Sequence, residues 1–254
     1  MYIIVIMIFP KTEEEIKNIR KAGKIVAEFL EKVEKLMKPG VSAKQIDDLA
    51  WEIAKKRGGH PSFYGYKGYP ASSCVSINNE VIHGIPYKEK ILKEGDVVSI
   101  DYGVMYGGFH ADAAKTFIIG DVDERTKLLV EVTEKALLEA IKFLKHGVKT
   151  GDIGNIIESY VKKYGFSVVK EYCGHGIGRK LHEDPPILNY GKPGQGIVLV
   201  KNMTICIEPM VCAGSGKVKV LKDGWTVVSE DGSIAAHFEH TVRVGEEESE
   251  ILTE

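Results

Sequence analysis

Two acidic side chains stand at matching places in two strand-like segments that lie far apart in the chain. Asp101 lies near the end of residues 95–102 and Glu208 ends residues 202–208. The segments are rich in β-branched residues, and the two acids are separated by 107 residues. A single acid at a strand end is more often a turn former or a helix cap. The chemical interpretation therefore depends on what accompanies these two.

A second acid follows each of the first two, on the next predicted strand. These are Asp112, within residues 109–119, and Glu239, within residues 237–244. Four carboxylates that converge in apolar surroundings repel one another, and unpaired buried charge is costly. A pair of divalent cations bridged by carboxylates removes this cost. The arrangement therefore predicts a dinuclear metal site.

Three histidines lie in glycine- or proline-rich stretches. His175 has a glycine on each side, which leaves its imidazole accessible as a ligand or catalytic group. His83 and His182 lie in predicted loops at residues 82–86 and 181–186, where a histidine is more often an ordinary surface residue. Carboxylates with one imidazole form a fairly hard ligand set that suits Mn, Fe(II), Co or Zn. None of the four cysteines has a CxxC spacing that would indicate a thiolate site.

Two helix pairs are predicted to carry these strands. Thr12 and Glu15 form a capping box ahead of apolar residues spaced as a helix through Met37, and Ser42 with Gln45 opens a second helix. A shift of 107 residues aligns this pair with a second one without a gap, and six of the twenty residues from 40 to 59 are identical after the shift. The sequence therefore predicts a duplicated unit with internal pseudo-twofold symmetry. Mixed element order favours an α+β fold.

The composition limits the possible partners. The chain has 254 residues, 44% of them apolar, with Lys+Arg 34 against Asp+Glu 36 and a net charge of -2. This composition indicates a globular protein and offers no basic field for nucleic acid or for a membrane surface. The apolar start, residues 1–10, is too short to span a bilayer, and we expect a β-strand there. We expect the acidic tail, residues 246–254, to be frayed.

Six ordered motifs identify a family resemblance. INNEVIHGIP, SIDYG, HADAAKTF, GHGIGRKLHEDP, ICIEPM and FEHTV resemble, in order and spacing, the methionine aminopeptidases. The short gaps of 33 residues from His175 to Glu208 and 31 from there to Glu239 resemble the type I form. The resemblance implies the pita-bread α+β fold, with an antiparallel sheet covered by two helix pairs. We expect one catalytic domain over residues 1–254, with repeat halves at about 12–120 and 121–245.

The resemblance also implies a role for each candidate in the metal site. Asp101 and Asp112 would bind one metal, Asp112 and Glu239 would bridge, and His175 and Glu208 would complete the second site. A bridging hydroxide would attack the carbonyl after the initiator methionine, with Glu208 helping to manage the proton. His182 would stabilise the oxyanion, and His83 would contact the scissile amide or the leaving nitrogen.

The same resemblance implies a methionine pocket and a substrate. Its lining would be Tyr66, Tyr69, Cys74, Leu181 and Trp225, together with His83 and His182. Without the resemblance, ordinary core packing would explain the first five. Leu181 stands where a phenylalanine is common, so we expect a somewhat looser wall. The implied activity is removal of the initiator methionine from nascent chains with a small second residue, by a cytoplasmic monomer. Any contact with the ribosome would be made by the catalytic domain alone.

Two alternatives remain open. Prolidase and aminopeptidase P share the fold and ligands, but they usually carry an extra N-terminal domain, which we do not expect here because the first family helix starts at Thr12. A non-catalytic binding module on the same fold generally loses ligands, whereas all five are present here.

Overall fold

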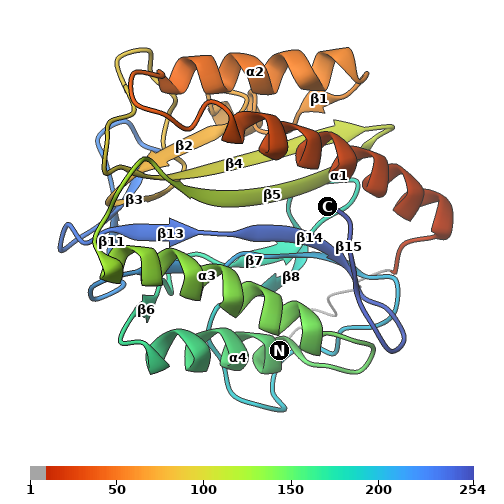
Figure 1. Cartoon of the computed structure of the whole chain (residues 1–254). Coiled ribbons are helices and arrows are strands. Elements are labelled where there is room, and N and C mark those ends of the chain that lie inside the picture. The colour runs from red at the N-terminus through yellow and green to blue at the C-terminus, as the bar shows by residue number, and fades with distance from the viewer. Residues whose placement is uncertain (1–9) are drawn as a thin grey trace.

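Two pairs of helices flank a central layer of strands. The computed structural model describes residues 10–254, so the strand predicted at the start of the chain lies outside the described residues. Figure 1 shows α1 (Glu13–Glu34) and α2 (Ala43–Lys56) on one side of the strands, and α3 (Glu124–Phe143) and α4 (Thr150–Lys163) on the other. A separate apolar core lies with each pair. This arrangement confirms the predicted α+β class.

The first helix begins where its capping signal predicts. Thr12 accepts a hydrogen bond from the Glu15 N–H, and Glu15 accepts one from the Thr12 N–H, which satisfies two otherwise unpaired donors. The helix ends at Glu34 and is followed by a turn, so the predicted extension to Met37 is too long.

Within residues 10–254 the main sheet has nine strands, with the order β1-β4-β5-β14-β9-β7-β8, β2 beside β4 and β15 beside β14. All the pairings of the described strands are antiparallel. The bounds of its strands are β1 His60–Pro61, β2 Cys74–Ile77, β4 Val97–Tyr106, β5 Phe109–Ile118, β7 Gly174–Gly176, β8 Glu183–Ile187, β9 Thr204–Ile207, β14 Glu239–Arg243 and β15 Glu250–Ile251.

Two smaller sheets complete the described strands, with the orders β13-β10-β6 and β11-β12-β3. Their bounds are β3 Glu80–Ile82, β6 Ser167–Val168, β10 Met210–Cys212, β11 Val218–Val220, β12 Val227–Ser229 and β13 Ala235–His237. A short 3-10 helix, η1, covers Tyr66–Gly68.

The predicted 107-residue repeat is visible in the backbone. Helices α2 and α4 each have 14 residues and begin at positions 43 and 150. The isolated bridge between Ser42 and Ile91 recurs, displaced by the same interval, between Lys149 and Val198. The predicted pseudo-twofold symmetry therefore extends from the sequence to the hydrogen bonding. The exact limits of the two halves stay a prediction.

Two further local predictions are wrong. The loop predicted at residues 181–186 runs into strand β8, which pairs with β7. The acidic tail is not frayed, because β15 pairs with β14, Arg20 binds Glu250 at 2.8 Å and Leu252 is buried against α1. The tail is ordered by this packing, which a local sequence pattern does not reveal. In the described part of the chain, none of the helices is long and apolar enough to cross a membrane.

Candidate metal centre

Three acids are brought together by the register of four neighbouring strands. Asp101 on β4 lies opposite Ala114 on β5, and Ala114 lies opposite Glu239 on β14. The same antiparallel register continues past the His240–Ile207 pair, where Glu208 follows β9. Residues directly opposite one another point to the same face of a sheet. The small side chain of Ala114 therefore lies between two carboxylates on that face.

The remaining acid comes from a second, adjacent row. Asp112 is two residues before Ala114 and so shares its face. The Asp112 N–H donates to the Thr241 hydroxyl oxygen at 2.9 Å, and that hydroxyl donates to the Asp112 carbonyl at 2.8 Å. Thr241 in turn lies opposite Cys206 on β9, which pairs with β7, the strand of His175. Two rows of one sheet face thus supply all five predicted ligands.

The histidine of this set has one nitrogen committed to the backbone. His175 Nδ1 lies 2.9 Å from the Gly176 carbonyl oxygen, which can only accept. The proton of the neutral ring is therefore on Nδ1, and Nε2 keeps its lone pair. Nε2 points to Glu208 Oε1 at 3.6 Å. Two electron-rich atoms that face each other at this distance are well placed to share a cation.

The acids are strongly perturbed by their surroundings. Burial raises the pKa of Asp101, Glu208 and Glu239 well above the usual range, and repulsion from neighbouring acids raises each pKa further. Burial lowers the pKa of His175 to about 3. Among the described residues, no lysine or arginine lies within ion-pair distance of these acids, which favours an external cation.

The unpaired polar atoms test whether a metal fits. Among the described residues, five buried side-chain atoms have no hydrogen-bond partner, and four of them belong to this site: Asp101 Oδ1, Asp112 Oδ1, Glu239 Oε1 and His237 Nε2. Three groups of three residues each place their possible ligand atoms within 4.8 Å of one another, and Glu239 belongs to all three. Three of these atoms are carboxylate oxygens, and unsatisfied buried carboxylate oxygens that lie close together are expected where a cation binds. The donor set fits divalent metal ions.

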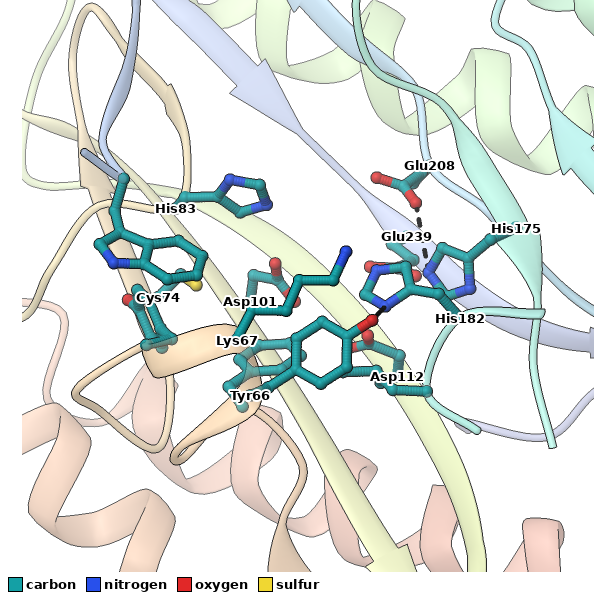
Figure 2. A pocket seen from close by; sticks show the side chains of 14 residues that line it. Tyr66, Lys67, Cys74, His83, Asp101, Asp112, His175, His182, Glu208 and Glu239 are labelled. Carbon is teal, nitrogen blue, oxygen red and sulfur yellow. Dashed lines mark hydrogen bonds and ion pairs between the residues drawn. The ribbon is translucent and has the colours of Figure 1, made fainter. Parts of the chain in front are cut away.

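A pocket opens beside the carboxylates, and both predicted loop histidines line it (Figure 2). His182 Nδ1 shares a hydrogen bond with the Tyr66 hydroxyl at 2.9 Å, and the two rings stack. His83 has a left-handed backbone with φ of 59° and packs edge-on against Trp225. Burial lowers the pKa of both histidines to about 4, so both rings are neutral near pH 7.

The rest of the pocket wall is mainly apolar. Tyr69, Cys74, Leu181 and Trp225, the predicted lining, belong to one cluster with Tyr66. The Tyr69 hydroxyl donates to the carbonyls of two loop residues, Ser73 and Gly84, which leaves its ring for the pocket. The cavity is about 160 Å³, small beside the roughly 300–1,000 Å³ of sites for drug-sized ligands. It suits one side chain with its adjoining backbone.

Sequence reasoning missed four contributors to this region. Phe63 and Lys67 line the pocket, Thr241 clamps Asp112, and His237 reaches Glu208. Lys67 has a left-handed backbone with φ of 49° close to two glycines, an unusual conformation that no local pattern marks. His237 had a usable signal, because it stands two residues before Glu239 and shares its face in an extended chain.

Comparison with known proteins places the chain in a class. Residues 17–246 match the family described as metallopeptidase family M24, and the chain belongs to that family. A methionine aminopeptidase of Clostridium acetobutylicum is 47% identical over 97% of this chain and 99% of its own length. The crystal structure of a methionine aminopeptidase from Thermotoga maritima covers 98% of this chain and 100% of its own, with 52% identity and a TM-score of 0.97.

A more distant likeness bears on the alternative function. A prolidase from Pyrococcus furiosus superposes with a TM-score of 0.79 at 24% identity, and the match covers 96% of this chain but 65% of that one. Identity this low shows a shared fold alone.

Proposed function

We propose that this chain is a metal-dependent methionyl aminopeptidase that removes the N-terminal methionine from peptides with a small second residue. The observation that carries the proposal is the position of five candidate ligands beside a small apolar pocket with two neutral histidines at its wall. Relatives named methionine aminopeptidase match the chain over nearly its full length.

The candidate ligands divide between two cations. Asp101 and Asp112 would hold one ion, His175 and Glu208 the other, and Asp112 with Glu239 would bridge them. Co, Mn, Fe(II) and Zn all suit this set of carboxylates and one imidazole. When bound, the ions would neutralise the carboxylates and activate a water molecule as the nucleophile.

The other side chains would handle protons and orient the substrate. Glu208 would accept a proton from the nucleophile and pass it to the leaving nitrogen. His182, held by Tyr66, would donate to the developing oxyanion, and the stacking fixes the direction of that donor. His83 would contact the scissile amide from the opposite wall (Figure 2).

The apolar wall would select methionine. Tyr69, Cys74 and Trp225 offer aromatic faces and a soft sulfur, which favour a flexible thioether. The small volume leaves little room beyond the scissile bond, so a large second side chain would be excluded.

The test is turnover of two peptides by metal-reconstituted protein. We expect Met-Ala-Ser to be cleaved at least about 100-fold faster than Met-Leu-Ser, a ratio typical of steric exclusion. Equal rates, or no cleavage with any of Co, Mn, Fe(II) or Zn, would contradict the proposal. A dipeptide with proline in second place and no methionine tests the prolidase alternative, and we expect no turnover.

The setting of the reaction is also proposed. Four free cysteines are typical of a reducing compartment, which supports a cytoplasmic location. New N-termini arise there at the ribosome, so nascent chains would be the natural substrates. That the enzyme works as a monomer stays a prediction.

A further inference from the structure

His237 is a buried histidine outside the five predicted ligands. Its side chain is 1% exposed, and its Nε2 has no hydrogen-bond partner among the described residues. The nearest carboxylate oxygen to it is Glu208 Oε2, at 3.8 Å. An unpaired polar atom in such a position is costly unless it finds a partner in the working protein.

The Glu208 carboxylate consequently lies between two imidazoles. One oxygen faces His175 at 3.6 Å, and the other faces His237 at 3.8 Å. His175 lines the pocket, whereas His237 is not among the residues that line it. His237 therefore approaches Glu208 from outside the cavity in which cations and substrate would lie.

The backbone of His237 is firmly held. The Thr116 hydroxyl accepts from the His237 N–H at 2.9 Å and donates to the His237 carbonyl at 2.7 Å. The Thr116 hydroxyl also shares a hydrogen bond with the Ser99 hydroxyl on β4. On its other side, His237 pairs with Met210 on β10, two residues after Glu208. The backbone of His237 is thus held by two neighbouring strands, and its imidazole lies 3.8 Å from Glu208 Oε2 and within 4.8 Å of a Glu239 carboxylate oxygen.

The chemistry of a neutral imidazole selects the role. A neutral ring has one N–H and one lone pair, and a carboxylate oxygen offers only lone pairs. Once Glu208 is ionised, as a metal ligand must be, His237 Nε2 can satisfy it only as a donor. The distance of 3.8 Å exceeds the usual 2.7–3.2 Å of such a bond, so the bond requires the two groups to move closer.

We propose that His237 is a positioning residue of the metal centre, which donates a hydrogen bond from Nε2 to Glu208 Oε2 and leaves Oε1 to bind the cation. This inference rests on the proposed metal site. Residues that hydrogen-bond a ligating carboxylate orient it and typically change metal affinity about 10–100-fold when removed.

The main test compares His237→Leu with His237→Gln by calorimetric titration of Mn²⁺ into metal-free protein. Leucine removes the donor, and glutamine offers an amide N–H in its place. We expect a loss of about 10–100-fold in affinity for the tighter ion with leucine and recovery to within about threefold with glutamine. His240→Gln is the matched control, because His240 lies on β14, the next strand along the chain, and its Nδ1 hydrogen-bonds the Thr253 hydroxyl. We expect it to bind Mn²⁺ like the wild type.

A second measurement uses the wild-type protein and so does not depend on whether a variant folds. In Zn²⁺-loaded protein labelled with ¹⁵N-histidine, we expect His237 Nε2 to carry the proton and His175 Nε2 to be bound to the ion. An unprotonated, metal-bound His237 Nε2 would overturn the inference, as would equal affinity in the leucine variant and the wild type. Failure of the wild type to bind Mn²⁺ or Zn²⁺ at all would instead reject the proposed metal site.

Discussion

The two halves of the molecule share a scaffold and differ in their strands. Helices α2 and α4 correspond residue for residue after the 107-residue shift. In the first half, β4 and β5 form one hairpin of ten residues each, paired from end to end. In the second half, β9 has four residues and β14 five, and strands β10 to β13 separate them in the sequence. The strand pair is therefore continuous in the first half and interrupted by inserted strands in the second.

The difference shows how a duplicated fold acquires a site. The unbroken hairpin holds Asp101 and Asp112 inside its strands, where the ladder fixes their separation. In the second half the acids stand at the ends of strands. Glu208 directly follows β9, and Glu239 is the first residue of β14. The inserted strands also bring Trp225 beside Tyr69 from the first half. The first half thus supplies a continuous strand pair, and side chains from both halves line the pocket.

Asp112→Asn gives the largest expected effect, because Asp112 would serve both ions. The amide keeps the shape but cannot provide the bridging charge. We expect kcat/KM for Met-Ala-Ser to fall by more than about 100-fold. This exceeds the loss of about 10–100-fold that is typical when a residue that only hydrogen-bonds a metal ligand is removed. Metal analysis should show fewer bound ions per chain. Asp48→Asn on the exposed face of α2 is the control, and it should leave both measurements unchanged.

Opposed acids from the two halves predict a pH-dependent metal affinity. The raised pKa values of Asp101, Glu208 and Glu239 mean that the metal-free folded protein holds protons that the unfolded chain would release. That stabilisation is present at low pH and is lost as the pH rises through the folded pKa values. Cations displace these protons, so affinity should rise about tenfold per pH unit for each proton released.

Calorimetry in buffers of different ionisation enthalpy, from about pH 6 to about pH 8, counts the released protons. Binding that is independent of pH would contradict the picture of mutually repelling, partly protonated acids. Asp112→Asn should lower the proton count, because it removes one of the repelling charges.

Sequence patterns predicted the repeated parts better than the interrupted ones. The capping boxes and the 3.6-residue spacing predicted the helices well, because those signals are local. The 107-residue interval and the family motifs were enough to group Asp101, Asp112, His175, Glu208 and Glu239 into one site. The contribution of His237 depends on how β13 and β10 pair, and the ordered tail depends on distant packing against α1. The packing of the tail leaves no periodic trace in the sequence, and the two-residue spacing of His237 and Glu239 indicates a shared face but not the contact with Glu208.

Gly23 marks another difference between the halves. A Cβ on Gly23 in α1 would lie 1.9 Å from the Leu252 carbonyl oxygen, because the chain's C-terminal end packs there. The corresponding position in α3 holds Val130, which is half-buried. We expect Gly23→Ala to lower the free energy of unfolding by about 3 kcal/mol, because the new Cβ overlaps the Leu252 carbonyl oxygen. This cost outweighs the preference of about 1 kcal/mol that a helix has for alanine over glycine. Urea unfolding measures this change. Val130→Ala is the matched substitution, and we expect it to lower the free energy of unfolding by about 1 kcal/mol. A stabilising Gly23→Ala would show that the tail does not pack on α1.

The smallest expected difference concerns the third residue of two equivalent helices. Within residues 10–254, Gln45 in α2 accepts one hydrogen bond, from the Ser42 N–H at 2.9 Å. Its counterpart Asp152 in α4 accepts the Lys149 N–H at 2.9 Å and also the Gly194 N–H at 2.6 Å. A carboxylate forms stronger hydrogen bonds and also favours a helix N-terminus. We expect Gln45→Ala to cost about 0.5 kcal/mol and Asp152→Ala about 1.5 kcal/mol in the free energy of unfolding. Equal costs would mean that the Gly194 contact adds nothing and that the two helix starts are energetically alike, as their shared backbone alone would suggest.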